Sequence, residues 1–334
     1  MKRSLALAMC AALMALMAGC SLDPLSGRLT TAQPDEPTYQ PVSPSADRLA
    51  GDERTVTLYF GFGDMGMLAT ESRTISVSPG TRLEQRVIEE LISGPDAAHA
   101  QLRSLMPAGV RLMQLEGVDG VMMVTLSSEF LNAPADAPAD WEGDAYWAQE
   151  VPRRRMLALQ SIVCAITDLG KYDSVQLLID FDGDGGRQGE RVQRYYFYPG
   201  TAREAGVLLE AVRRDESAVL TARNTVGAAL DCLQGKDWER LMQLIAPGDS
   251  EGERPSPEEA QARLQGLGYT LTGFEVGDAM VAGDGGSATV CVDVQLAYGD
   301  GDARAVSAFP LLLRRDAGAW KVTWSSLMGL LEGY

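Results

Sequence analysis

Residues 174–186 read "SVQLLIDFDGDGG", and the first half of this stretch decides the fold. Its apolar side chains stand at every second position: Val175, Leu177, Ile179 and Phe181. Such alternation predicts a β-strand with one face in a core. Upstream, residues 153–169 carry apolar residues at helical spacing, and residues 108–131 read as a hairpin with an Asp119-Gly120 turn. This part of the chain is therefore predicted to hold two paired strands, a helix and a third strand.

The second half of the stretch begins as a calcium-binding loop does. Asp180, Asp182 and Asp184 stand at alternate positions and a glycine follows. The complete pattern also requires a glutamate eleven residues after the first aspartate, where this chain has Arg191. We interpret the aspartates as a turn that leads to a returning strand at 191–199. A calcium site on the three aspartates is the weaker alternative.

Further elements precede this region. Residues 55–60, "TVTLYF", alternate as a strand does, and residues 79–95 follow as a helix. Thr81 and Glu84 have the spacing of a capping box, and Gly94-Pro95 stops the helix. The order of strand, helix, strand pair, helix and strand predicts an α+β layer with the helices on one face of a sheet.

The ordered set of segments between residues 54 and 198 resembles the GerMN domain of spore-germination and bacterial envelope lipoproteins. The segments that carry the resemblance are "TLYF" (57–60), "VIEELISGP" (87–95), "MPAGVRL" (106–112), "DGVMMVTLSSEF" (119–130), "ITDL" (166–169) and "VQLLIDFDG" (175–183). The resemblance implies a fold similar to the ring-building modules of secretion and sporulation assemblies. It also implies a non-enzymatic protein, and it brings no catalytic residues.

The first twenty residues have the organisation of a bacterial lipoprotein signal peptide. Lys2 and Arg3 precede an apolar run over residues 5–18, which is shorter than the roughly 20 residues that span a bilayer. The run ends in "LMAGC", which resembles a lipobox and implies that Cys20 is lipidated. Residues 21–53 are rich in proline and polar residues, which predicts a tether rather than a domain.

The remainder of the chain predicts a second folded domain. Helical patterns at 217–247 and 256–268 precede strand patterns at 270–283, 287–299 and 303–316, and residues 319–327 close the fold. Helices followed by an antiparallel sheet resemble the cone of the NTF2-like superfamily. We therefore expect two α+β domains, GerMN at 54–200 and NTF2-like at 201–334, each with helices packed on a mostly antiparallel sheet.

Charge and histidine content exclude several functions. Lys and Arg number 29 and Asp and Glu 46, for a net charge of −17, which argues against a nucleic-acid partner. His99 is the only histidine, and we interpret it as a surface residue in a polar turn. A histidine-based catalytic triad or dyad needs that base beside a nucleophile. We therefore expect no enzyme activity and no cofactor.

An acidic segment at residues 132–155 contains three aromatic residues: Trp141, Tyr146 and Trp147. One interpretation is a lid whose rings pack on its own domain, with Arg153, Arg154 and Arg155 held by the segment's own acids. The other is a loop that docks a partner protein, because such rings are favoured at binding surfaces.

These features predict a membrane-anchored extracytoplasmic lipoprotein without catalytic activity. It would act in cell-envelope or spore assembly or germination through protein–protein interaction. The candidate partners are the membrane, through the lipid anchor, other envelope or sporulation proteins, and further copies of the chain. The alternative is a ligand-binding lipoprotein that uses the C-terminal NTF2-like pocket.

Overall fold

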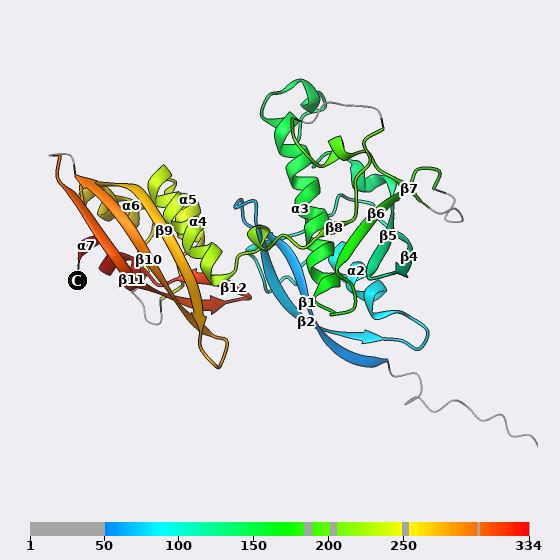
Figure 1. Cartoon of the computed structure of the whole chain (residues 1–334), viewed down its shortest axis with the longest axis horizontal. Coiled ribbons are helices and arrows are strands. Elements are labelled where there is room, and N and C mark those ends of the chain that lie inside the picture. The colour runs from blue at the N-terminus through cyan, green and yellow to red at the C-terminus, as the bar shows by residue number, and fades with distance from the viewer. Residues whose placement is uncertain (1–50, 184–188, 201–205, 249–253, 299–300, 334) are drawn as a thin grey trace, which may run out of the picture. The chain divides into compact units, whose positions relative to one another are not determined.

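The computed structural model describes residues 51–183, 189–200, 206–248, 254–298 and 301–333 (Figure 1). All of them fall within one compact unit that spans residues 46–334. The signal peptide, Cys20 and the tether up to residue 50 lie outside the described residues. Within the described ranges, no helix is both long and apolar enough to cross a bilayer.

The N-terminal part contains a three-stranded sheet in the order β2-β1-β3. β1 (Asp52–Phe62) includes the predicted strand at 55–60, and it pairs antiparallel with β2 (Leu68–Val77) and with β3 (Leu102–Arg103). β2 was not predicted. Its segment contains Glu71, which is buried, so apolar alternation does not show the strand.

A second sheet carries the elements predicted from residues 108–181. β4 (Leu112–Val118) and β5 (Val121–Ser127) form the predicted hairpin, and both turn residues, Asp119 and Gly120, have positive φ as a two-residue turn requires. β6 (Ser174–Asp180) then runs parallel to β5. The short strands β7 (Glu190–Arg191) and β8 (Val212–Arg213) both pair with β6.

Two helices complete this part. α2 (Leu83–Ser93) contacts β1 and β4, and α3 (Trp147–Thr167) contacts both β1 and β6, so α3 packs against a strand of each sheet. α3 is buried almost continuously from Ala158 to Ile166, and the Ser161 hydroxyl donates to the Tyr59 carbonyl at 2.6 Å.

The boundaries of both helices differ from the prediction. The expected capping box at Thr81 is wrong, because α2 begins after Arg82 and its Glu84 carboxylate contacts Lys171 at 3.1 Å instead. α3 begins six residues before Arg153. The Asp144 carboxylate accepts hydrogen bonds from the first amides, and Pro152, which favours a first-turn position, lies inside the helix.

The predicted returning strand at 191–199 is also wrong for most of its length. β7 ends at Arg191, and Arg194–Tyr196 form a 3-10 turn in which the rings of Tyr195 and Tyr196 stack at 4.4 Å. Successive side chains of a strand point to opposite faces, so such stacking excludes a strand there. Phe197 is buried and stacks on Phe130 at 6.4 Å, which draws this segment onto the domain.

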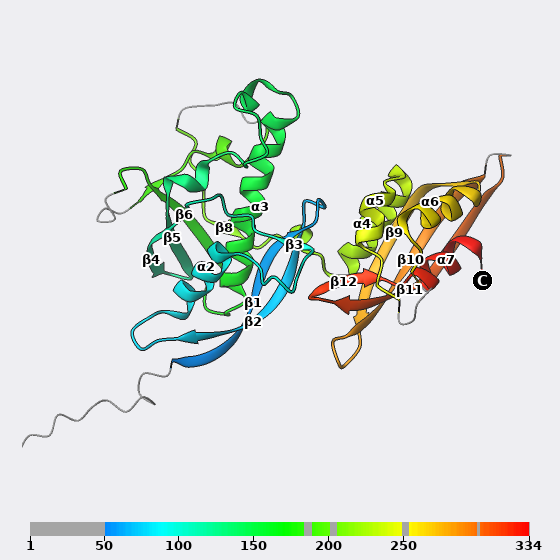
Figure 2. The same ribbon diagram turned by 180° about the vertical axis from the view of Figure 1, so that it is seen from behind.

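The C-terminal part is an antiparallel sheet with helices on one face (Figures 1 and 2). The chain first forms three helices: α4 (Ala222–Gly235), α5 (Trp238–Gln243) and α6 (Pro257–Gly266). Four strands follow: β9 (Tyr269–Val281), β10 (Ser287–Tyr298), β11 (Ala303–Asp316) and β12 (Ala319–Val322). Their order in the sheet is β12-β11-β10-β9. The capping box of Ser256 and Glu259 at α6 is present as predicted. An additional helix, α7 (Trp324–Glu332), packs on β11, so the closing segment at 319–327 is part strand and part helix. The α+β fold class is confirmed.

Candidate functional site

The first place in the structure that could bind another molecule is the aromatic segment, residues 132–147. Trp141 begins a 3-10 turn and Trp147 is the first residue of α3; both side chains are half-buried, whereas Tyr146 is 61% exposed. The ring of Tyr146 meets the ring of Trp147 edge-on, with 5.3 Å between centroids. Tyr146 is therefore the ring that this segment offers to solvent.

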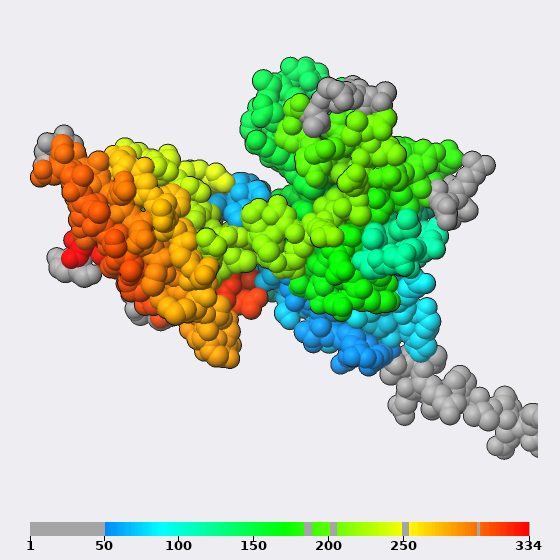
Figure 3. Space-filling view, in the orientation of Figure 1, coloured from blue at the N-terminus to red at the C-terminus, as the bar shows by residue number. Residues whose placement is uncertain are grey.

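Two arginines of α3 hold this segment. The guanidinium carbon of Arg155 lies 5.4 Å from the ring centroid of Trp141 and 5.5 Å from that of Tyr196. Arg155 is 6% exposed and donates to the Leu131 carbonyl, and its burial lowers its pKa. Cation–π contacts to two rings thus replace part of the water that this cation loses. In the space-filling view the surfaces coloured green and yellow-green adjoin one another (Figure 3).

Arg154 makes the second attachment. Its guanidinium carbon lies 5.2 Å from the Trp147 ring centroid, and it pairs with Asp136 and Glu150 at 2.8 Å each. Burial acts against the charged form of Arg154, but the hydrogen bonds to these two carboxylates outweigh it and raise its pKa. Asp136 of the segment and Glu150 of α3 itself therefore hold Arg154.

The second place is the aspartate turn after β6. The carboxylate of Asp180, a residue only 4% exposed, accepts a hydrogen bond at 2.9 Å from the amide of Gly183, three residues on, and so closes a local turn. Asp184 lies outside the described residues. Across the described ranges, no group of three or more His, Cys, Asp or Glu side chains has an arrangement that could hold a metal ion.

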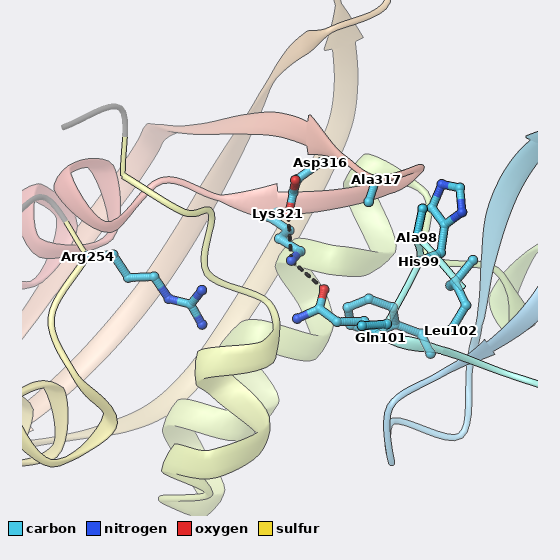
Figure 4. Close-up of a pocket in the computed structure, with 10 residues that line it drawn as sticks. Ala98, His99, Gln101, Leu102, Arg254, Asp316, Ala317 and Lys321 are labelled. Carbon is cyan, nitrogen blue, oxygen red and sulfur yellow. Dashed lines mark hydrogen bonds and ion pairs between the residues drawn. The ribbon is translucent and has the colours of Figure 1, made fainter. Parts of the chain in front are cut away.

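The third place is a cavity of about 210 Å³ beside the β11–β12 turn, here called the polar cavity (Figure 4). Phe62 lines it together with polar and charged side chains. These are His99, Gln101, Arg254, Asp316 and Lys321. Lys321 is 2% exposed, and its Nζ contacts Asp316 Oδ2 at 2.8 Å and Gln101 Oε1 at 2.5 Å. A buried ammonium needs such partners to remain charged.

His99 belongs to one wall of this cavity and is less exposed than the sequence suggested. Its side chain is 24% exposed, and Nδ1 lies 3.6 Å from Glu71 Oε2. Glu71 in turn pairs with Arg73 and accepts from the Asp96 amide at 3.0 Å. His99 is therefore partly exposed, and the 96–102 segment that carries it folds onto β2.

Sequence reasoning did not find the polar cavity. Gln101 and Lys321 are 220 positions apart, and no local pattern relates them. The only sequence signal is a lysine in the middle of the apolar "AWKVTW" segment at 319–324, where strand alternation alone would place it on an exposed face.

The cysteines among the described residues are free thiols: Cys164, Cys232 and Cys291. Burial raises the pKa of Cys164 to about 12 and that of Cys232 to about 11. Both thiols are thus protonated at neutral pH, whereas a nucleophilic cysteine requires a lowered pKa.

Comparison with known proteins matches residues 57–180 to the Germane family, described as sporulation and spore germination. No curated protein matches the chain. Similar solved structures include the tandem GerMN domains of the sporulation protein GerM from Bacillus subtilis, with 18% identity and a TM-score of 0.30 over 52% of this chain. The chain covers about half of that structure (48%).

Two further structures cover smaller parts. A putative lipoprotein from Clostridium perfringens has 22% identity and a TM-score of 0.23 over 38% of this chain and 75% of its own. A putative polyketide cyclase from Xanthomonas campestris has 15% identity and a TM-score of 0.22 over 33% of this chain and 94% of its own. The sequence identities and TM-scores of these structures are too low to carry an argument, so the assignment rests on the family match. Residues 57–180 are thus similar to the Germane family, described as sporulation and spore germination.

Proposed function

We propose that this chain is an extracytoplasmic lipoprotein that acts in sporulation, germination or envelope assembly by binding other proteins. The observation that carries the proposal is the Germane match at residues 57–180. The sequence before that domain supports it, because a lipobox-like "LMAGC" and a proline-rich segment would hold the domain at a membrane surface.

A non-catalytic role is supported by the state of the nucleophile and base candidates. The thiols of Cys164 and Cys232 are buried and protonated at neutral pH. The single histidine, His99, has Nδ1 directed at the carboxylate of Glu71. Neither arrangement is that of an activated nucleophile beside a general base.

For the partner surface we propose the aromatic segment. Tyr146 is 61% exposed and packs on Trp147, so a partner would meet a ring that is already fixed in orientation. Rigid aromatic side chains lose little conformational entropy on binding, which favours them at interfaces.

The anchor is tested by cell fractionation. Cys20→Ser should move the protein from the membrane to the soluble fraction and abolish labelling by a palmitate analogue. Cys10→Ser, in the same leader, is the matched control and should leave both unchanged. If the Cys20→Ser protein stays on the membrane with its leader removed, the anchor proposal fails.

The role is tested by deletion and complementation in the source organism. Loss of the chain should reduce spore yield, germination or, in an organism without spores, envelope integrity. The wild-type chain should restore the phenotype, whereas Cys20→Ser should restore it less well. A deletion strain with normal sporulation and a normal envelope would contradict the proposal.

A second function, ligand binding by the C-terminal domain, is favoured by one observation. A cavity of about 420 Å³ is lined by residues of that domain alone, among them Arg263, Trp324, Met328 and Glu332. This volume lies in the range of small-molecule pockets. Native mass spectrometry of the chain purified from its own organism should then show a bound small molecule, and its absence would leave the protein-binding role.

A further inference from the structure

Two cations approach the polar cavity from different elements. Lys321 reaches it from β12, and Arg254, from the segment before α6, points toward Lys321 and Gln101 from the opposite wall (Figure 4). Asp316, paired with Lys321 at 2.8 Å, compensates one of the two positive charges. Asp316 thus leaves one positive charge at the cavity, in a chain whose net charge is −17. Cations that face one cavity are stabilised when an anion lies between them.

The orientation of Gln101 adds hydrogen-bond donors to the same space. Lysine is a donor only, so the amide atom that faces Lys321 Nζ at 2.5 Å must be the oxygen. The amide nitrogen of Gln101 therefore points away from Lys321, on the side where Arg254 stands (Figure 4). The guanidinium of Arg254 is itself positioned by a 2.8 Å hydrogen bond from Nη2 to the Met242 carbonyl.

We propose that the polar cavity binds a phosphate group, held by Arg254, the amide nitrogen of Gln101 and the ammonium of Lys321. The volume of about 210 Å³ is below the roughly 300–1,000 Å³ of pockets for drug-sized ligands, which suits a phosphate or a headgroup rather than a larger ligand. Guanidinium and ammonium groups are the side chains that recognise phosphate in proteins. Donors on different walls suit a tetrahedral oxyanion better than a planar carboxylate.

The test measures binding of inorganic phosphate by calorimetry, with the full chain carrying Cys20→Ser so that no lipid anchor contributes. The wild-type cavity should give a saturable heat that weakens as salt increases. Arg254→Gln should weaken binding at least tenfold. Gln101→Glu should abolish it, because it keeps an acceptor for Lys321 but replaces the amide donors with a negative charge.

The matched control is Arg54→Gln, which removes a positive charge that pairs with Asp52 at 2.6 Å and lines neither the polar cavity nor the cavity of the C-terminal domain. It should bind phosphate as the parent chain does. Melting curves show whether each variant is folded. Equal binding by all variants, equal losses in Arg254→Gln and Arg54→Gln, or no saturable heat in any of them would overturn the proposal.

A vesicle experiment separates a free phosphate from a lipid headgroup. Sedimentation with phosphatidylglycerol vesicles, but not with phosphatidylcholine vesicles, and its loss in Arg254→Gln, would identify a headgroup as the source. Phosphate binding without vesicle binding would identify a soluble ligand. Vesicle binding that Arg254→Gln leaves intact, together with no binding of inorganic phosphate, would overturn the proposal. The inference does not rest on the proposed protein-binding role, whose deletion and capture experiments give separate readouts.

Discussion

Nη1 of Arg154 lies 2.9 and 2.8 Å from the two carboxylate oxygens of Asp136. This pair joins the aromatic segment to α3, because Asp136 and Arg154 are 18 positions apart and belong to different elements. Arg154 also lies over the ring of Trp147. The position of the segment therefore depends on charge as well as on apolar contact.

The pair predicts a dependence of stability on pH. The hydrogen bond from Arg154 lowers the pKa of Asp136, so the unfolded chain binds this proton more readily than the folded one. The stability that the ion pair adds to the folded state is then fully present above the unfolded pKa of about 3.9. It is lost as the pH falls through the lower pKa of the folded state. Asp136→Asn should be less stable than wild type at pH 7 by only about 0.2–1 kcal/mol, because the Asp136 side chain is 61% exposed.

Urea denaturation at a series of pH values measures this difference. It should be constant near neutrality and shrink toward zero in acid. In a chain that already carries Arg154→Gln, the Asp136→Asn change should cost almost nothing. Identical pH profiles for wild type and Asp136→Asn would show that the ion pair makes no contribution in solution.

The aromatic rings predict separate effects on stability and binding. Trp141→Ala and Trp147→Ala each remove a half-buried ring and a cation–π contact worth about 0.5–2 kcal/mol, so we expect each to lower the free energy of unfolding by roughly 1–3 kcal/mol. Tyr146→Ala should change stability by less than about 0.5 kcal/mol, because that side chain is exposed. Under the proposed docking role, Tyr146→Ala should still reduce capture of a partner.

Chemical denaturation and affinity capture together check these outcomes. Loss of stability in the tryptophan variants with normal capture in Tyr146→Ala would favour the lid. Unchanged stability with lost capture would favour a docking loop. A double tryptophan variant that is normal in both assays would contradict both interpretations.

Elements with strict local requirements were predictable from the sequence. The hairpin turn at Asp119-Gly120 needs positive φ at both positions, and few residue pairs allow that. The capping box at Ser256 and Glu259 is likewise a local pattern whose hydrogen bonds form within one turn. Residue type alone restricts the backbone at the hairpin turn, whereas the capping-box pattern does not, since the same spacing at Thr81 and Glu84 forms no box.

Elements that depend on tertiary partners were not predictable. β2 contains a buried Glu71 whose charge is satisfied by Arg73 and the Asp96 amide, and no local signal shows that these partners will be present. The polar cavity is a stronger case, because it forms only when residues near 100, 254 and 320 meet. Sequence patterns report neighbours along the chain, and this site is made of neighbours in space.

The aspartate turn predicts a negative result with calcium. The Asp180 carboxylate already accepts from the Gly183 amide, and Arg191 stands where a calcium loop places its bidentate glutamate. Micromolar calcium should therefore change neither the melting temperature nor the intrinsic fluorescence. A micromolar dissociation constant that disappears in Asp182→Ala would overturn this interpretation.

Gly318, in the β11–β12 turn, allows us to predict how far one added methyl group lowers the free energy of unfolding. Gly318 has a φ of +85°, and a Cβ added there would lie 1.9 Å from the Thr70 carbonyl oxygen of β2. The contact is close because the Thr70 hydroxyl also donates to the Gly318 carbonyl at 2.8 Å. Gly318→Ala should therefore meet both an unfavourable backbone conformation and an overlap with a main-chain atom that cannot move alone.

Gly285→Ala is the matched control, because Gly285 has a φ of +67° and open space where its Cβ would be. The control should lose about 1–2 kcal/mol for the left-handed conformation alone. Gly318→Ala should lose roughly 1–3 kcal/mol more, the usual cost of overpacking. Urea denaturation of the two variants measures the difference. Equal losses would mean that the turn does not contact β2 in solution, and the polar cavity, whose Asp316 and Lys321 flank that turn, would then lack one of its walls.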